Sequence, residues 1–196
     1  MKYGTTIIKN VVLTKLKRKW WKMSKVEVLV GLPGSGKSTF VKNVFGDDPS
    51  GVFIYSTDNY IERVGKITGK TYNESFKDNI DAATKYMNDT LVEVLKLNTR
   101  VVWDQTNMSS KKRRGILSRF PKSYRKVCWC IAPPRTPEEW AELDRRLASR
   151  EGKTIPHHII EAMADSYVEP ELDEGFDYIL IVDLFGNMIA EKGVAL

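Results

Sequence analysis

Apolar residues along this chain follow two alternating patterns. Short continuous apolar runs are typical of strands buried on both faces, and apolar positions three and four residues apart are typical of helices. The predicted strands cover residues 26–30, 51–56, 100–107, 126–132 and 176–182. Because strands and helices alternate, we expect an α/β fold, a parallel sheet of about five strands with helices on both faces.

A long amphipathic helix is the clearest of the predicted helices. Its apolar stripe, which we assign to the core, consists of Phe76, Ile80, Ala83, Met87, Leu91 and Val94. Other helices are predicted at 38–44, 109–120, 137–150 and 156–168, with a short helix or turn at 57–65. In sheets of this kind ligands bind at the carboxyl ends of the strands, so the polar residues there are the candidates for chemistry.

The first strand ends in a glycine-rich loop, "GLPGSGKS", which fits the pattern G-x-x-x-x-G-K-[ST]. A loop that surrounds phosphate must bring backbone N–H groups close to oxygen, and glycine allows this because it has no side chain. The helix that begins at Lys37 would direct free N–H groups and the positive end of its dipole at the anion.

ATP and Mg²⁺ are therefore the predicted cofactors. We expect Lys37 to reach the β- and γ-phosphates and Ser38 to bind Mg²⁺. The predicted nucleotide-binding residues are Gly31, Pro33, Gly34, Ser35, Gly36, Lys37, Ser38 and Thr39.

Aspartates follow the second and third predicted strands. Asp58 is placed to accept a proton from an attacking hydroxyl, and Asp104 to hold Mg²⁺. Helix capping is the alternative role for either residue. The predicted acceptor contacts are Thr57, Asn59, Arg63, Asn107, Arg113 and Arg114.

Three arginines, Arg145, Arg146 and Arg150, stand in a segment between two predicted helices, residues 144–153. Helical spacing puts Arg146 and Arg150 on one face. A mobile pair of this kind would close over the phosphates, stabilise the charge of transfer and exclude water. Exposed ion pairs with Glu142 and Glu151 are the alternative. We name residues 144–153 the lid segment.

The net charge of +6 is unevenly distributed. Residues 1–23 hold seven Lys and Arg and no acid, so the other 173 residues carry a net charge of −1. A second basic run consists of Lys111, Lys112, Arg113, Arg114, Arg119, Lys122, Arg125 and Lys126. This run is compatible with a solvated helix face or with a track for a nucleic-acid backbone.

A chain of 196 residues suits one domain, which we place at 24–196 after a basic extension, 1–23. Trp20 and Trp21 among the lysines would suit a nucleic-acid-binding arm, and an extension without a role in catalysis is the alternative. No apolar run has bilayer length. Cys128 and Cys130 are expected on opposite faces of a strand, without a metal, and a reducing cytoplasm is the expected compartment.

Four blocks of sequence, in this order, resemble the phage and eukaryotic polynucleotide kinases and their close P-loop relatives. The blocks are "GLPGSGKSTF", "YSTDNY", "WDQTN" and "RLASREGKTIP", and "PELDEGFDYILIV" resembles the terminal segment of these kinases. The resemblance covers about residues 24–183 and implies a three-layer P-loop kinase fold. It also implies that Asp58 is the general base for a 5′-hydroxyl and that Arg146 and Arg150 belong to a lid over the nucleotide.

The acceptor side departs from this family. Thr57 stands where the family usually has arginine. Ile61 stands where some phage members have an arginine that grips the 3′-phosphate of the acceptor nucleotide. An extra stretch, residues 65–76, follows. The nucleotide side is therefore predicted more firmly than the acceptor.

We predict a kinase that transfers the γ-phosphate of ATP to a hydroxyl of nucleic acid, DNA rather than RNA, most simply the 5′-hydroxyl. One alternative is a hydroxymethyl group on a modified DNA base, as in phage DNA modification, and the expected location is then the host cytoplasm. A second is a small-molecule or nucleoside kinase. A third is a binding module or ATP hydrolase, which the absence of an acidic pair after an apolar strand disfavours.

Overall fold

A single sheet of six strands forms the centre of the structure, a computed structural model that describes residues 24–45, 51–150 and 152–194. The strands are β1 (Lys25–Val30), β2 (Val52–Tyr55), β3 (Arg100–Asp104), β4 (Arg125–Ile131), β5 (Tyr178–Val182) and β6 (Met188–Gly193). Their order in the sheet is β2-β3-β1-β4-β5-β6. The first five strands are parallel, and β6 runs antiparallel to β5. The predicted extension, 1–23, lies outside the described residues.

The prediction of an α/β P-loop kinase fold is confirmed, with one strand more than the five that the sequence predicts. Among the described strands, β6 pairs with β5 alone, and Met188 and Ile189 at its start are exposed. An edge strand of this kind lacks the continuous apolar run of a buried strand, so the pattern of the sequence does not reveal it. A turn in which the Asp183 carboxylate accepts from the Phe185 and Asn187 amides brings β6 back beside β5.

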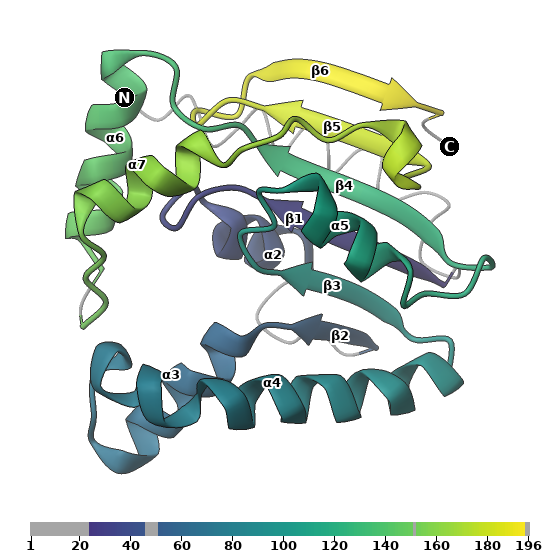
Figure 1. Ribbon diagram of the computed structural model, residues 1–196, viewed down its shortest axis with the longest axis horizontal. Coiled ribbons are helices and arrows are strands. Elements are labelled where there is room, and N and C mark those ends of the chain that lie inside the picture. The colour runs from purple at the N-terminus through teal and green to yellow at the C-terminus, as the bar shows by residue number, and fades with distance from the viewer. Residues whose placement is uncertain (1–23, 46–50, 151, 195–196) are drawn as a thin grey trace.

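Helices connect the strands and lie around the sheet (Figure 1). They are α2 (Lys37–Phe45), α3 (Thr57–Thr68), α4 (Tyr72–Lys96), α5 (Ser110–Leu117), α6 (Pro137–Ala148) and α7 (His157–Asp165), with a 3₁₀ turn, η1 (Leu172–Glu174). Helices α3 and α4 lie together beside β2, and the loop after α6 reaches towards α3 (Figure 1). Over the described ranges, every helix is too short or too polar to cross a bilayer.

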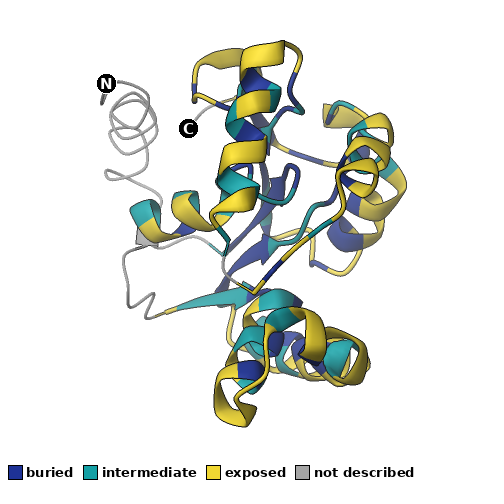
Figure 2. Cartoon of the chain, turned by 90° about the vertical axis from the view of Figure 1, so that its left-hand side faces the viewer, coloured by how far each residue is buried: buried dark blue, intermediate teal, exposed yellow. Residues whose placement is uncertain are grey.

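Two apolar clusters fill the space on the two faces of the sheet. On β1, Val28 faces the cluster that includes Leu91 of α4, and Leu29 faces the cluster that includes Val41 of α2. Both clusters follow from the alternation of side chains along each strand. Buried residues therefore concentrate in the sheet and on the inner helix faces, and exposed residues on the outer faces (Figure 2).

The prediction for the cysteines is wrong. Cys128 and Cys130 are both buried and both belong to the cluster that contains Val28. Residues two apart in a strand point to the same face, so neither thiol is on the surface. Burial raises the pKa of both thiols, and that of Cys130 to about 12.

A buried ion pair joins α5 to η1. The Arg113 guanidinium is fully buried, and its Nε and Nη2 donate to the two Glu174 carboxylate oxygens at 2.7 and 2.6 Å. Its Nη1 donates to the carbonyls of Asn107 and Met108, which follow β3. The prediction that Arg113 contacts the acceptor is therefore wrong, because the side chain is needed inside the fold.

Replacing Arg113 with methionine should lower the free energy of unfolding by about 3–5 kcal/mol, because Glu174 would remain buried without its partner. Chemical denaturation measures this. Arg114→Met is the control, since its ion pair with Asp173 is exposed and should change stability by less than about 0.5 kcal/mol. Equal losses in the two variants would contradict the assignment of the buried pair as a structural element.

Candidate active site

The carboxyl ends of β1 and β3 are joined by hydrogen bonds. The Gly31 amide donates to the Thr106 carbonyl at 3.0 Å, and the Asn107 side chain donates to the Leu29 carbonyl at 2.8 Å. Asn107 is fully buried, so the prediction that it contacts the acceptor is wrong. It instead holds the loop after β3 against the carboxyl end of β1, two residues before the phosphate loop.

The phosphate loop, residues 31–38, has the geometry of an anion-binding loop. Gly34 and Gly36 have φ of 78° and 111°, and a Cβ at Gly34 would lie 3.0 Å from Leu147 Cδ2. A side chain is therefore excluded there by both backbone and space. The hydroxyl of Ser35 is buried without a hydrogen-bond partner among the described residues. These features fit a loop that wraps the phosphates of a nucleotide.

Lys37 folds back over this loop. Its Nζ donates to the carbonyls of Gly31 and Leu32, both at 2.8 Å. Burial lowers the pKa of Lys37 to about 8, although the charges of Asp104 and Asp58 act in the opposite direction. A bound phosphate would compensate the buried ammonium and raise this pKa again.

Asp58, in the first turn of α3, is held by two side chains from other segments. Lys153 Nζ, at the end of the lid segment, lies 2.5 Å from Asp58 Oδ2, and the Tyr72 hydroxyl donates to Oδ1 at 2.9 Å. Partial burial raises the pKa of Asp58, but the charge and hydrogen bond of Lys153 and the bond from Tyr72 outweigh it, so the pKa is lowered. The carboxylate is therefore ionised at neutral pH and able to accept a proton.

Asp104 ends β3 and faces the same space. Burial raises its pKa, the nearby Lys37 lowers it, and the negative charge of Asp58 raises it again. Among the described residues, none donates a hydrogen bond to the Asp104 carboxylate. Ser38 is exposed in the first turn of α2, and within the described residues no group of three or more His, Cys, Asp or Glu side chains could hold a metal. A Mg²⁺ ion would thus take ligands from Ser38, the nucleotide phosphates and water, with Asp104 as the nearby carboxylate.

The two arginines predicted to close over the phosphates, Arg146 and Arg150, have different environments. Arg146 is fixed: its guanidinium donates to the Ser35 carbonyl at 3.0 Å and to Glu142 at 2.7 Å. Arg150 has no ion pair within the described residues, and its charge acts on both Lys37 and Asp58. Arg146 therefore supports the phosphate loop, and Arg150 carries a charge that is available to a ligand.

The remaining predicted acceptor contacts lie at different depths. Thr57 is buried, and its hydroxyl accepts from the Gln105 side chain. Asn59 and Arg63 are exposed on α3, where Arg63 lies over the Tyr60 ring. These three residues lie on α3, whereas Arg114 lies on α5 and donates to Asp173.

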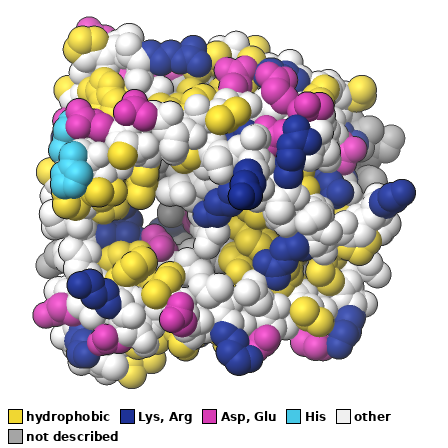
Figure 3. All heavy atoms as spheres, in the orientation of Figure 1, with side chains coloured by type: hydrophobic (Ala, Val, Ile, Leu, Met, Phe, Trp, Pro, Cys, Tyr) yellow, Lys and Arg dark blue, Asp and Glu magenta, His cyan; other side chains and the backbone are white. Residues whose placement is uncertain are grey.

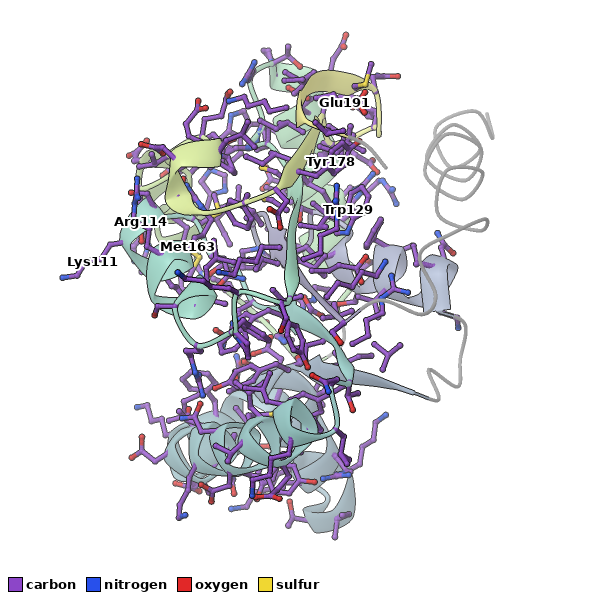
Figure 4. The ribbon with its side chains drawn as sticks, turned by 90° about the vertical axis from the view of Figure 1, so that its right-hand side faces the viewer. Lys111, Arg114, Trp129, Met163, Tyr178 and Glu191 are labelled. Atoms are coloured by element: carbon purple, nitrogen blue, oxygen red, sulfur yellow. The ribbon has the colours of Figure 1, made fainter. Side chains whose placement is uncertain are left out.

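The basic run on and after α5 is not one continuous surface. Lys111 points away from the molecule near Arg114 (Figure 4), and Arg119 lies over the Trp103 ring. Lys112 is exposed like Lys111, but partial desolvation lowers its pKa while the charge of Asp58 raises it. Lys112 is therefore the member of the run that electrostatics connects to the site.

Sequence reasoning missed Lys153, Tyr72 and Lys112 as individual site residues. Lys153 stands in the segment chosen for its arginines, and Tyr72 in the extra stretch. A lysine three residues after Arg150 of the lid segment was the available signal. No signal in the sequence marked Tyr72, because its hydrogen bond to Asp58 depends on how α3 and α4 pack.

The fold and the phosphate loop together define a P-loop kinase. The chain belongs to the AAA domain family, whose profile matches residues 26–170.

Known proteins that resemble the chain have different activities. A protein named guanylate kinase from Bdellovibrio bacteriovorus is 29% identical over 180 residues, which cover 84% of this chain and 92% of that protein. A structure from the PezAT toxin–antitoxin system of Streptococcus pneumoniae has a TM-score of 0.57 at 15% identity, over 98% of this chain and 83% of the other. A chain of the Pnkp1/Rnl/Hen1 RNA repair complex has a TM-score of 0.54 at 24% identity; the match covers 72% of this chain and 43% of that one.

Replacing Lys153 with methionine should raise the pKa of Asp58, because the positive charge that lowers it is lost while burial remains. Titration of the aspartate carboxyl carbons by NMR measures the shift. Lys85→Met, which removes an exposed lysine paired with Asp89, is the control. An Asp58 titration that is identical in Lys153→Met and wild type would contradict the assigned contact.

Proposed function

We propose that the protein is an ATP- and Mg²⁺-dependent kinase that transfers the γ-phosphate to a hydroxyl of a nucleic acid, in the simplest case a 5′-hydroxyl. The observation that carries the proposal is the position of Asp58. It is an ionised carboxylate beside the phosphate loop, within the electrostatic range of Lys37, and it is oriented by Lys153 and Tyr72. A hydroxyl acceptor needs such a base, because its proton must leave as the bond to phosphorus forms.

Each of the other charged groups would then have a role in phosphoryl transfer. Lys37 would leave the loop carbonyls for the β- and γ-phosphates, and Ser38 would bind Mg²⁺ with Asp104 nearby. Arg150 would stabilise the charge on the transferred group, and Arg146 would keep the loop in shape. All of these residues lie in 24–196, to which we assign catalysis, and we place the protein in the cytoplasm.

The second candidate is a kinase of a mononucleotide or another small molecule. The likeness to the protein named guanylate kinase favours it, since that name indicates a nucleotide acceptor. The fold-level likeness to a chain of an RNA repair complex is compatible with the first candidate. A hydroxymethyl group on a modified DNA base remains a variant of the first candidate, because it also presents a hydroxyl to Asp58.

One assay separates these candidates. Labelled ATP is offered with hydroxyl-ended oligonucleotides, hydroxymethylated duplex DNA, nucleosides and nucleoside monophosphates, and phosphate release is followed in parallel. We expect transfer to the oligonucleotides, and Asp58→Asn should lower kcat about 10²-fold or more with ATP affinity little changed. Lys37→Ala should abolish transfer. Label that appears only on monophosphates or as free phosphate would refute the proposal.

Lys112→Gln should weaken oligonucleotide binding and make the dependence of log K on log salt less steep by about 0.7, the loss of one phosphate contact to a single strand. Binding titrations at several salt concentrations measure the slope. Lys111→Gln is the matched control, because that side chain extends into solvent one residue away (Figure 4). The same change of slope in both variants would indicate that the basic run is a solvated helix face and not a contact surface for nucleic acid.

A further inference from the structure

A cavity of about 540 Å³ separates the corner between α3 and α4 from the end of the lid segment. Figure 3 shows the surface on this side of the molecule, with a hollow between the α3–α4 pair and the helices above it and Lys and Arg atoms beside that hollow. Its lining includes Lys66, Lys70, Tyr72, Arg150 and Lys153. A volume of this size suits a small ligand such as one nucleotide.

The wall on the α3–α4 side is built by the extra stretch, 65–76. Helix α3 ends at Gly69 with φ of 69°, and the Lys70 amide donates to the Gly65 carbonyl at 2.9 Å. A Cβ at Gly65 would lie 2.7 Å from the Lys70 carbonyl oxygen, so the tight corner requires glycine there. Helix α4 then begins with a capping box between Thr71 and Glu74. The corner is therefore an ordered element with a fixed shape.

The lid segment and Thr154, the residue after it, meet the start of α4 across the cavity. The Asn73 side chain donates to the Thr154 carbonyl at 3.2 Å, and a Cβ at Gly152 would lie 3.5 Å from Thr71 Cβ. The Lys153 ammonium lies 3.8 Å from the centre of the Tyr72 ring. These contacts hold the lid segment beside the corner between α3 and α4, so that Lys66, Lys70 and Lys153 line the same cavity.

The lining carries an excess of positive charge. Among the described lining residues, four side chains are cationic and one, Glu62, is a carboxylate. Glu62 lies 3.3 Å from Lys153, which also pairs with Asp58. Lys70 has a loose, exposed pair with Asp78 at 3.6 Å. Within the described residues, Lys66 and Arg150 have no carboxylate partner. Several cations around a cavity of limited size favour an anionic ligand, because part of their charge is uncompensated.

The cavity adjoins the candidate base. Tyr72 and Lys153 both line it, and both also hold the Asp58 carboxylate. A molecule in the cavity would therefore lie beside the residue that accepts the hydroxyl proton. A charged group on that molecule would contact the lysines of the corner while its hydroxyl reached Asp58.

We propose that this cavity is the acceptor subsite and that it binds a phosphate ester carried by the acceptor close to its reactive hydroxyl. Lys66 and Lys70 contact the phosphate, and Tyr72 packs against the attached sugar or base. The inference rests on the proposed function, since it takes Asp58 as the base. A nucleoside monophosphate and the first phosphodiester of an oligonucleotide present the same chemistry.

Direct binding tests the subsite without turnover. Calorimetry with a non-hydrolysable ATP analogue and Mg²⁺ present compares a nucleoside, its 3′-monophosphate and a dinucleotide. We expect Lys66→Gln and Lys70→Gln each to raise the Kd of both phosphate-bearing ligands about three- to tenfold, because each variant loses a charge-assisted contact. The Kd of the nucleoside and of the ATP analogue should not change.

Lys85→Gln is the matched control, an exposed lysine of α4 outside the cavity, and should bind all three ligands as wild type does. A preference for the monophosphate over the dinucleotide identifies a terminal phosphate, and equal affinities identify a phosphodiester. Equal weakening of nucleoside and phosphate-bearing ligands, or no preference for phosphate in wild type, would overturn the subsite. If phosphate binding depends on Lys66 but no hydroxyl receives label, the subsite stands and the proposed kinase activity is refuted.

Discussion

The parallel direction of five strands is the constraint on which the site depends. Parallel strands need crossover connections, so all their carboxyl ends lie at one edge of the sheet. The phosphate loop, the first turn of α3 and the loop after β3 therefore meet, although they are far apart in sequence. The bond from the Gly31 amide to the Thr106 carbonyl and the buried Asn107 fix two of these ends together.

Charge balance across this edge explains the state of its ionisable groups. Buried ammonium and carboxylate groups would each lose charge if they were isolated. Here the opposite charges compensate burial at Asp58, whose pKa is lowered, and only in part at Lys37 and Asp104, where burial remains the larger effect. Lys153 is the element of this network that belongs to the lid segment. The position of the lid and the ionisation of Asp58 are therefore coupled.

Much of the fold was predictable because its signals are local. The apolar runs of β1 and β4, the apolar stripe of α4 and the glycine pattern of the phosphate loop each need only neighbouring residues to be recognised. The errors share a different origin. Arg113 and Asn107 are polar residues close in sequence to the predicted site. Whether such a residue is buried or faces a ligand depends on partners that are distant in sequence, as Glu174 is for Arg113.

The sequence by itself determined the order of strands and helices along the chain, the phosphate loop and the two aspartates near the carboxyl ends of β2 and β3, since spacing and residue type carry that information. Only the tertiary structure decided which charges face a ligand. It buried Arg113, fixed Arg146 to the loop, and brought Lys153 and Tyr72 to Asp58. The physical reason is that the electrostatic environment of a charge depends on groups that packing, not sequence distance, brings within a few ångströms.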